Sequence, residues 1–387
     1  MLRWMLVGMM LLAALLLVPS TTLPCTLCGA GNPQDSQTLR QSAASAKLII
    51  YGTLANPRLA KDDDGLAGKG TTDLKIERVL KSDPWLGDKK VVEINRYIPV
   101  DPKAPPKFLV FCDILNNQLD PYRGVPVKAA VLVDYLKGAI AVDPKNSTKS
   151  LLYFFDYLDS TDQTVATDAY LEFAKANDQE IGQVAKKLSP DKLRRIMQDA
   201  QTPALRLGLF AFLLGACGGD RDATLLRSMI EKPNERTKEA LSGIFAGYIA
   251  LKPRDGWDLA LSILRDGQRP FLERNAVLGT LRFYHGSKPD ESRRDVLRGL
   301  AAVLDQGDIA DIAVEDLRRW QIWDLTSDVL AQYGKKSHDA PLVRRTIIRY
   351  AISCPKPEAA RFVAERRKED AELVKEIEES LEFEKTK

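Results

Sequence analysis

The stretch "TPALRLGLFAFLLGACGGDRDATLLRSMI", residues 202–230, decides the fold class of most of this 387-residue chain. Its apolar residues recur at spacings of three and four, which is the period of an amphipathic α-helix. Pro203 stands at the opening, the pair Gly218–Gly219 interrupts the pattern, and Asp220 precedes the second apolar run. The stretch therefore predicts two helices joined by a short break.

The same layout recurs along the second half of the chain. Its opening positions, 203, 234, 270, 309 and 341, are 31, 36, 39 and 32 residues apart. Spacings this irregular exclude an exact tandem repeat and match an α-solenoid built from helix pairs. The predicted units are Pro203–Ile230, Asn234–Leu264, Pro270–Leu304, Ile309–Tyr333 and Pro341–Glu365, with a less regular one at Ser150–Lys187.

The unit at 202–230 resembles a HEAT repeat. It has a Pro at its second position, Arg206 three residues later, an apolar helix face, and Asp220 before the second helix. The segments "RPFLERNAVLGTLRFY" (269–284) and "APLVRRTIIRYAISC" (340–354) resemble that repeat less completely. The likeness covers about residues 150–365. It implies a curved superhelix of antiparallel helix pairs whose usual task is to hold another protein.

Residues 47–111 follow a different pattern, with runs typical of β-strands separated by turns rich in Gly, Pro and Asp. Four or five strands in such a short segment predict a small antiparallel barrel or sandwich. The expected strands are "KLIIYGTLA" (47–55), "TTDLKIERVLK" (71–81), "KKVVEINRYIPV" (89–100) and "KFLVFCDI" (107–114), the last of them buried on both faces.

This N-terminal part resembles, more weakly, the OB-barrel of the netrin and tissue-inhibitor-of-metalloproteinase type. The likeness rests on a cysteine pair near the start, the strands "AKLIIYGTLA" and "LKIERVLK", and the late "FLVFC" strand. That family opens with Cys-x-Cys, whereas this chain has Cys-x-x-Cys at Cys25 and Cys28 and lacks the further cysteines of the family.

The first residues have the pattern of a signal peptide. Arg3 precedes an apolar run from Trp4 to Val18, and Pro19, Ser20 and Thr21 end it. The run is shorter than the roughly 20 residues that a membrane-spanning helix needs, although an uncleaved anchor is the alternative interpretation. We therefore expect residues 1–22 to be removed and the mature chain, with no transmembrane segment, to be secreted or to reside in the periplasm or cell envelope.

Cys25 and Cys28 are expected to fasten the fold. Haem attachment requires a His after the second cysteine, where Gly29 stands, and a zinc site requires further ligands near the pair. Because an oxidising compartment favours disulfides, we expect a bridge from Cys25 or Cys28 to Cys112, with a local Cys25–Cys28 bridge as the alternative. The other two cysteines, Cys217 and Cys354, are predicted to be small buried hydrophobes in separate units.

The sequence offers little that predicts catalysis or a cofactor. Its formal net charge is +3, with both signs mixed, which argues against a nucleic-acid partner. The loop "KDDDGLAGKG" (61–70) has neither the spacing of a calcium loop nor that of a phosphate cradle, and is predicted to be a solvated hairpin tip. Two lone histidines, His285 and His338, give acid–base catalysis little to use. Carboxylate pairs remain open, because the chain has 53 acidic residues.

One surface candidate lies in the last units. Arginines and aromatic residues enriched at protein interfaces cluster there, and Arg345 and Arg349 are four residues apart, on one helix face. If both units present these faces on one side, a partner-binding patch results. The alternative is that the arginines pack between repeats and the tryptophans belong to the core. The candidate residues are Arg318, Arg319, Trp323, Arg345 and Arg349, with Trp320, Arg344 and Tyr350 beside them.

Together these observations predict an α+β multidomain protein. The expected divisions are a signal peptide (1–22), an OB-like antiparallel β-barrel (23–125), a connecting helix and linker (126–149), and a HEAT-like α-α solenoid (150–387) whose end is capped by 357–381. The predicted function is non-enzymatic: an exported scaffold that binds an unknown protein partner and needs no cofactor. The alternatives are a protease-inhibitor-like module acting through the barrel and a hydrolase using carboxylate chemistry.

Overall fold

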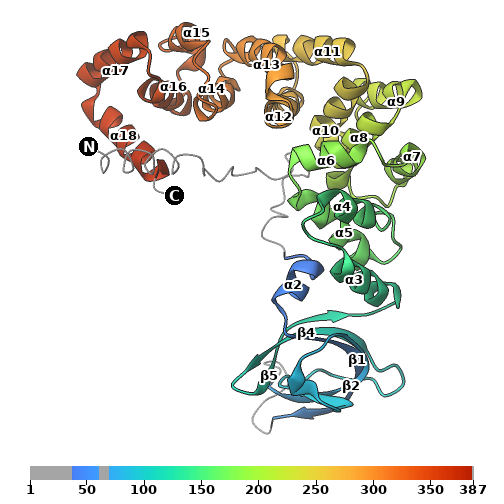
Figure 1. The fold of residues 1–387 in the computed structure, drawn as a ribbon. Coiled ribbons are helices and arrows are strands. Elements are labelled where there is room, and N and C mark those ends of the chain that lie inside the picture. Colours follow the sequence, from blue (N-terminus) through green and yellow to red (C-terminus); the bar gives the residue numbers. More distant parts are fainter. Residues whose placement is uncertain (1–36, 61–68, 386–387) are drawn as a thin grey trace, which may run out of the picture.

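The computed structural model describes residues 37–60 and 69–385. The predicted signal peptide, Cys25, Cys28 and most of the loop 61–70 lie outside these residues. The described chain has an α+β layout, in which a small antiparallel sheet is followed by a helical region that reaches the C-terminal end (Figure 1).

The sheet has five strands in the order β3-β2-β1-β4-β5, all pairs antiparallel. Four strands occupy the predicted runs, whereas β5 was not anticipated because Pro121 and Gly124 interrupt its pattern. A Pro is tolerated there because an edge strand has neighbours on one side only. The strands are β1 (Leu48–Leu59), β2 (Gly70–Lys81), β3 (Val91–Ile94), β4 (Lys107–Leu115) and β5 (Gln118–Pro126), with a short 3-10 helix η1 (Pro84–Leu86) before β3.

The central strands β1 and β4 are buried on both faces. Ile50 and Cys112 point into an apolar cluster within the sheet. Their neighbours Ile49, Tyr51 and Phe111 point the other way and join the core of the helices. The alternation of a strand thus divides its side chains between two cores, and the sheet is attached to the helical region by buried apolar surface.

A short helix, α2 (Leu39–Ser45), lies between the sheet and the helices and was not anticipated. Thr38 and Gln41 form a capping box at its start. Arg123 of β5 donates to the Thr38 carbonyl at 3.4 Å, and Asp168 of α5 (Gln163–Lys175) accepts from the Leu39 N–H at 2.7 Å. Tertiary hydrogen bonds on two sides therefore hold a helix whose sequence has little apolar periodicity.

The remaining chain is helical, and each of the five regular predicted units contains two helices. The segment 126–149, expected as connecting helix and linker, holds α3 and the start of α4. These helices are α3 (Val131–Ala141), α4 (Ser147–Phe155), α5 (Gln163–Lys175), α6 (Asp178–Ala185), α7 (Pro190–Gln198), α8 (Ala204–Cys217), α9 (Asp220–Glu231), α10 (Glu235–Leu251), α11 (Pro253–Arg265), α12 (Phe271–Ser287), α13 (Pro289–Val303), α14 (Ala310–Arg319), α15 (Thr326–Leu330), η2 (Lys336–His338), α16 (Pro341–Ser353), α17 (Pro357–Glu369) and α18 (Ala371–Lys385).

From α9 onward the helices form an arch of two rows (Figure 1). The helices α9, α11, α13, α15 and α17 lie on the outer side, and α10, α12, α14, α16 and α18 on the inner side. Hydrogen bonds show that neighbouring inner helices run in the same direction. Arg236 at the start of α10 donates to the Thr202 carbonyl just before α8, and Thr280 of α12 donates to the Ser242 carbonyl of α10, both at 2.9 Å. The first turns of α8 and the inner helices therefore line one edge of the arch.

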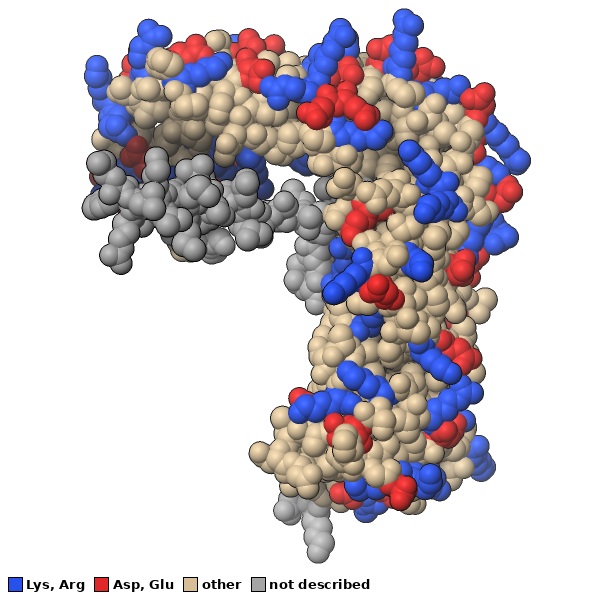
Figure 2. Space-filling view, viewed as in Figure 1, with Lys and Arg blue, Asp and Glu red and all other residues tan. Residues whose placement is uncertain are grey.

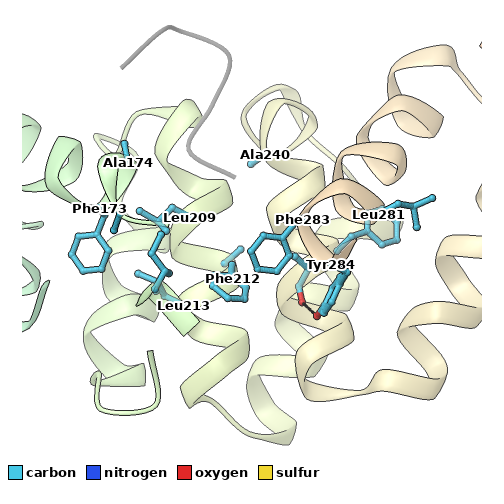
Figure 3. Close-up of a cluster of buried hydrophobic side chains, with 14 of the residues drawn as sticks. Phe173, Ala174, Leu209, Phe212, Leu213, Ala240, Leu281, Phe283 and Tyr284 are labelled. Atoms are coloured by element: carbon cyan, nitrogen blue, oxygen red, sulfur yellow. Dashed lines mark hydrogen bonds between the residues drawn. The ribbon is translucent and has the colours of Figure 1, made fainter. Parts of the chain in front are cut away.

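The core of the helical region is continuous from α5 to α12, as Figure 3 shows around Phe173, Leu213 and Phe283. The rings of Phe212 and Phe283 meet edge to face with centroids 4.5 Å apart. The Tyr284 hydroxyl donates to the Ala246 carbonyl at 2.8 Å. Large apolar side chains fill the interior, and the buried Tyr284 hydroxyl among them has its partner.

The surface carries both signs of charge, with Lys and Arg interspersed among Asp and Glu on the face that Figure 2 shows. Among the residues described, no helix combines the length and the apolar composition needed to cross a bilayer.

Candidate protein-binding surface

The predicted patch comes from two inner helices and the turn after the first. Arg318 and Arg319 form the last turn of α14, and Trp323 follows it. Arg345 and Arg349 lie one turn apart on α16, so their side chains share a face. All five predicted residues lie in the described chain, and the structure brings the arginines of the two helices close together.

The arginines converge on α18. Arg318 and Arg349 each donate to the carboxylate of Glu384 at 2.8 Å. One turn before Arg349 on α16, Arg345 makes a bidentate pair with Glu376, at 2.8 and 3.1 Å. The patch that was predicted to meet a partner therefore meets the chain's own last helix.

A second acid lies under the same arginines. Glu315 of α14 accepts from Arg318 at 2.8 Å and from Arg319 at 2.7 Å, and its other oxygen lies 4.0 Å from Arg349. Arg318 is held between Glu315 and Glu384, and its side chain is only 9% exposed. Arg319 points outward and is 64% exposed. Arg319 is thus the predicted arginine most open to solvent.

The charge states follow from these contacts. Hydrogen bonding to Glu315, joined by Glu384, raises the pKa of Arg318 above its usual value. The bond to Glu376 raises the pKa of Arg345, and the same bond lowers the pKa of the Glu376 carboxyl. Each group is therefore stabilised in its charged form, and the surface is a set of ion pairs at neutral pH.

The aromatic residues are packed against the helices. Trp323 meets Tyr350 edge to face, with ring centroids 5.1 Å apart. Trp320 stacks on His285 of α12 at 3.9 Å, and burial lowers the pKa of that imidazole. Both tryptophans thus contribute to contacts between neighbouring units.

An open cavity of about 810 Å³ lies beside the arginines. Trp323, Ile352 and Leu381 supply apolar walls, and Arg319 and Glu382 stand among the charged ones. Gln321, which also lines the cavity, has a φ of 55°. Gln321 follows the end of α14, and a residue in this left-handed conformation commonly terminates a helix. The bond from the Ile322 N–H to the Leu317 carbonyl, at 2.9 Å, is part of this termination.

The acidic partners of the patch were not anticipated from the sequence. The signal that could have found them is the sequence separation of the bonded residues. It is 31 for both Arg345–Glu376 and Arg349–Ser380, and 34 for Arg282–Asp316. These separations fall within the spacing of the units. A charge on one unit thus pairs with the equivalent position of the next.

Of the three cysteines in the predicted bridge, Cys112 is the one that the structure describes. Cys112 is buried in the sheet cluster, and burial raises the pKa of its thiol to about 12, while its predicted partners Cys25 and Cys28 lie outside the described residues. The bridge stays a prediction, which mass mapping of the non-reduced chain would test. Cys217 and Cys354 are free in the described chain.

The part of the chain that is described contains no group of three or more His, Cys, Asp or Glu side chains placed to hold a metal ion. No family model, no curated protein and no solved structure matches this chain.

Proposed function

We propose that this chain is an exported, non-enzymatic protein that binds a partner protein through a HEAT-like solenoid. In this proposal the sheet is an OB-like barrel that terminates the N-terminal end of the solenoid. Signal-peptide removal places the mature chain outside the cell or in the cell envelope. The arch of helix pairs supports the proposal, because stacked pairs of this kind create an extended surface suited to holding another protein.

One observation carries the proposal. Three leucines occupy the first turns of α8, α12 and α16, and they are exposed to 49% (Leu205), 73% (Leu272) and 63% (Leu342). These first turns lie along the edge of the arch described above, and Phe271 adds a fourth apolar side chain beside Leu272. The leucines stand on every second helix of this edge, with the first turns of α10 and α14 between them, and exposed apolar side chains gathered along one edge are typical of a protein-binding surface. We call these four residues the apolar edge.

The arginines near the apolar edge are bonded to other residues of the same chain. Arg274 of α12 is buried and pairs with Asp308 at 2.5 Å. Arg236 donates to two carbonyls before α8, those of Asp199 and Thr202. These bonds hold the loops that support the first turns, so the leucines are presented on a fixed backbone. A rigid apolar edge loses little conformational entropy when it binds.

The test uses the full chain, exported with its own leader and cross-linked in place before purification. We expect one partner to be enriched reproducibly with the parent chain and lost with the triple variant Leu205→Glu, Leu272→Glu, Leu342→Glu. The control is Leu115→Glu, a leucine on β4 that is 52% exposed, which should retain the partner. Equal recovery by the triple variant and the control, or no reproducible partner for any chain, would contradict the proposal.

A further inference from the structure

The last inner helix, α18, is held less extensively than the others. α10 packs against helices on both sides within the arch and buries ten of its residues. α18 packs against α16 and α17, and its buried residues in the described chain are Val374, Ile377 and Leu381. Few buried contacts are typical of the segments that open first in a protein.

Part of the contact of α18 with α14 and α16 is made by ion pairs whose glutamates are near solvent, although the Arg318 side chain of α14 is itself mostly buried. The Glu376 side chain is 64% exposed and pairs with Arg345, while Glu384 is 41% exposed and pairs with Arg318 and Arg349. Ser380, midway between the two glutamates, accepts from Arg349 at 3.1 Å. Exposed ion pairs contribute little to stability and are weakened by salt.

The charges of the two surfaces are complementary beyond these pairs. α18 contains six glutamates and two lysines, a formal charge of −4. The surface beneath it carries the three arginines Arg318, Arg345 and Arg349, with Glu315 paired to Arg318 among them. We call these three arginines the arginine groove. Its occupant has polar groups at 376, 380 and 384, one every four residues, and buried apolar residues at 374, 377 and 381. This is the pattern of an amphipathic helix with an acidic stripe beside its apolar stripe.

The connection to α17 allows α18 to leave as a unit. Asp370 is the single residue between the two helices, with φ −148° and ψ 88°. Its carboxylate accepts from the Leu373 N–H at 2.9 Å and so caps α18. Rotation at this single linking residue can turn α18 away without unwinding α17, and its release also breaks the ion pair between Arg367 of α17 and Glu378 of α18.

We propose that the arginine groove is a binding site for an acidic amphipathic helix of a partner protein, and that α18 occupies it as an internal ligand which the partner displaces. The site adds a second surface to the partner-binding function proposed above. It uses no residue of the apolar edge, so each proposal can fail while the other holds. Displacement costs the partner the free energy of α18 docking, which keeps the groove closed to weak ligands.

The test uses a fluorescent peptide with the sequence of residues 371–385. In the full-length variant E376K/E384K, the resident helix loses its pairs with all three arginines, and the peptide should bind at least about tenfold more tightly than to the parent chain. The matched control is E379K/E382K, which makes the same change of charge at glutamates whose ion pairs lie within α18. The control should bind the peptide as the parent does, and 0.5 M NaCl should abolish binding.

A second measurement covers the case in which the variant does not fold. With an excess of the isotope-labelled peptide, the parent chain should show faster hydrogen exchange in its own residues 371–385, because the peptide displaces them. A peptide with Lys at the positions of Glu376 and Glu384 should have no such effect. Equal peptide affinity for all three chains, or unchanged exchange of the parent's α18 under saturating peptide, would overturn the proposal.

Discussion

At the scale of single residues, Asp168 is a buried carboxylate that joins α5 to α2 and α3 near the sheet. It accepts from the Leu39 N–H at 2.7 Å and from the Tyr135 hydroxyl at 2.8 Å, and it is buried. Desolvation raises its pKa to about 6, while Arg123 opposes the shift and Glu172, one turn along α5, adds to it. Keeping this group charged therefore costs free energy in the folded state.

We expect the free energy of unfolding to respond to the pH in a way that identifies Asp168. Because its pKa in the folded chain lies above the ordinary value of 3.8, the folded state binds more protons between pH 4 and 6 and loses stability as the pH rises through that range. In the variant Asp168→Asn, the amide oxygen can still accept from Leu39, and its N–H₂ can donate to Tyr135. Its stability relative to the parent should therefore rise by about 2–3 kcal/mol from pH 4 to 7.

Urea unfolding of both chains at several pH values checks this expectation. The variant Tyr135→Phe is the companion measurement, since it removes a bond that lowers the pKa of Asp168 and should make the loss of stability larger and extend it to higher pH. Parallel stability curves for the parent and Asp168→Asn would show that Asp168 does not titrate as its burial implies.

At the scale of elements, glycines of α10 allow its backbone to approach the backbone of α8 closely. A Cβ built on Gly243 would lie 2.1 Å from the Gly208 carbonyl oxygen, and one on Gly247 would lie 2.2 Å from the Ala211 carbonyl oxygen. Both neighbours are backbone atoms, which cannot move aside without separating the helices. The absence of side chains at these positions thus sets the distance between two neighbouring units.

The variant Gly243→Ala should lower the free energy of unfolding by about 1–3 kcal/mol, because the added methyl group overpacks the helix contact. Gly182→Ala on α6 is the matched control, since an added Cβ there meets no atom within 4 Å. That control should stabilise the chain by about 0.5–1 kcal/mol through helix propensity. Chemical denaturation measures both. Similar effects of the two substitutions would show that the α8–α10 contact is not close.

At the scale of the whole molecule, the end of the helical array needs a cover. The sequence predicted that residues 357–381 cap the array, and α17 and α18 lie at this end with buried residues facing the preceding helices. Removing residues 371–387 uncovers the α16 surface and leaves Arg345 and Arg349 without Glu376 and Glu384. The array would then end in an exposed apolar face.

This deletion should lower the melting temperature by roughly 3–10 °C, given the apolar side chains it unpacks, and should promote association at high protein concentration. Differential scanning calorimetry and light scattering measure the two effects. The variant E379K/E382K, which keeps the cover in place, serves as the control. Unchanged melting and scattering after the deletion would show that α18 does not act as a cap.

The local pattern of the sequence determined most elements. Apolar residues at spacings of three and four located both helices of each regular unit, and alternating or continuous apolar runs located four of the five strands. Such elements can be predicted because the period of a helix or strand is imposed within a few neighbouring residues. For the same reason, Arg345 and Arg349 could be placed on one face before any neighbouring helix was known.

The tertiary structure alone decided the elements and contacts that depend on distant residues. β5 carries Pro121 and Gly124 and is held by its pairing with β4, and α2 is held by Arg123 and Asp168 on either side. The arginines were found from the sequence, but their partners on α18 were not. Ion pairs between units join residues more than 30 positions apart, and no local period reports which of the chain's 53 acidic residues packing brings to them.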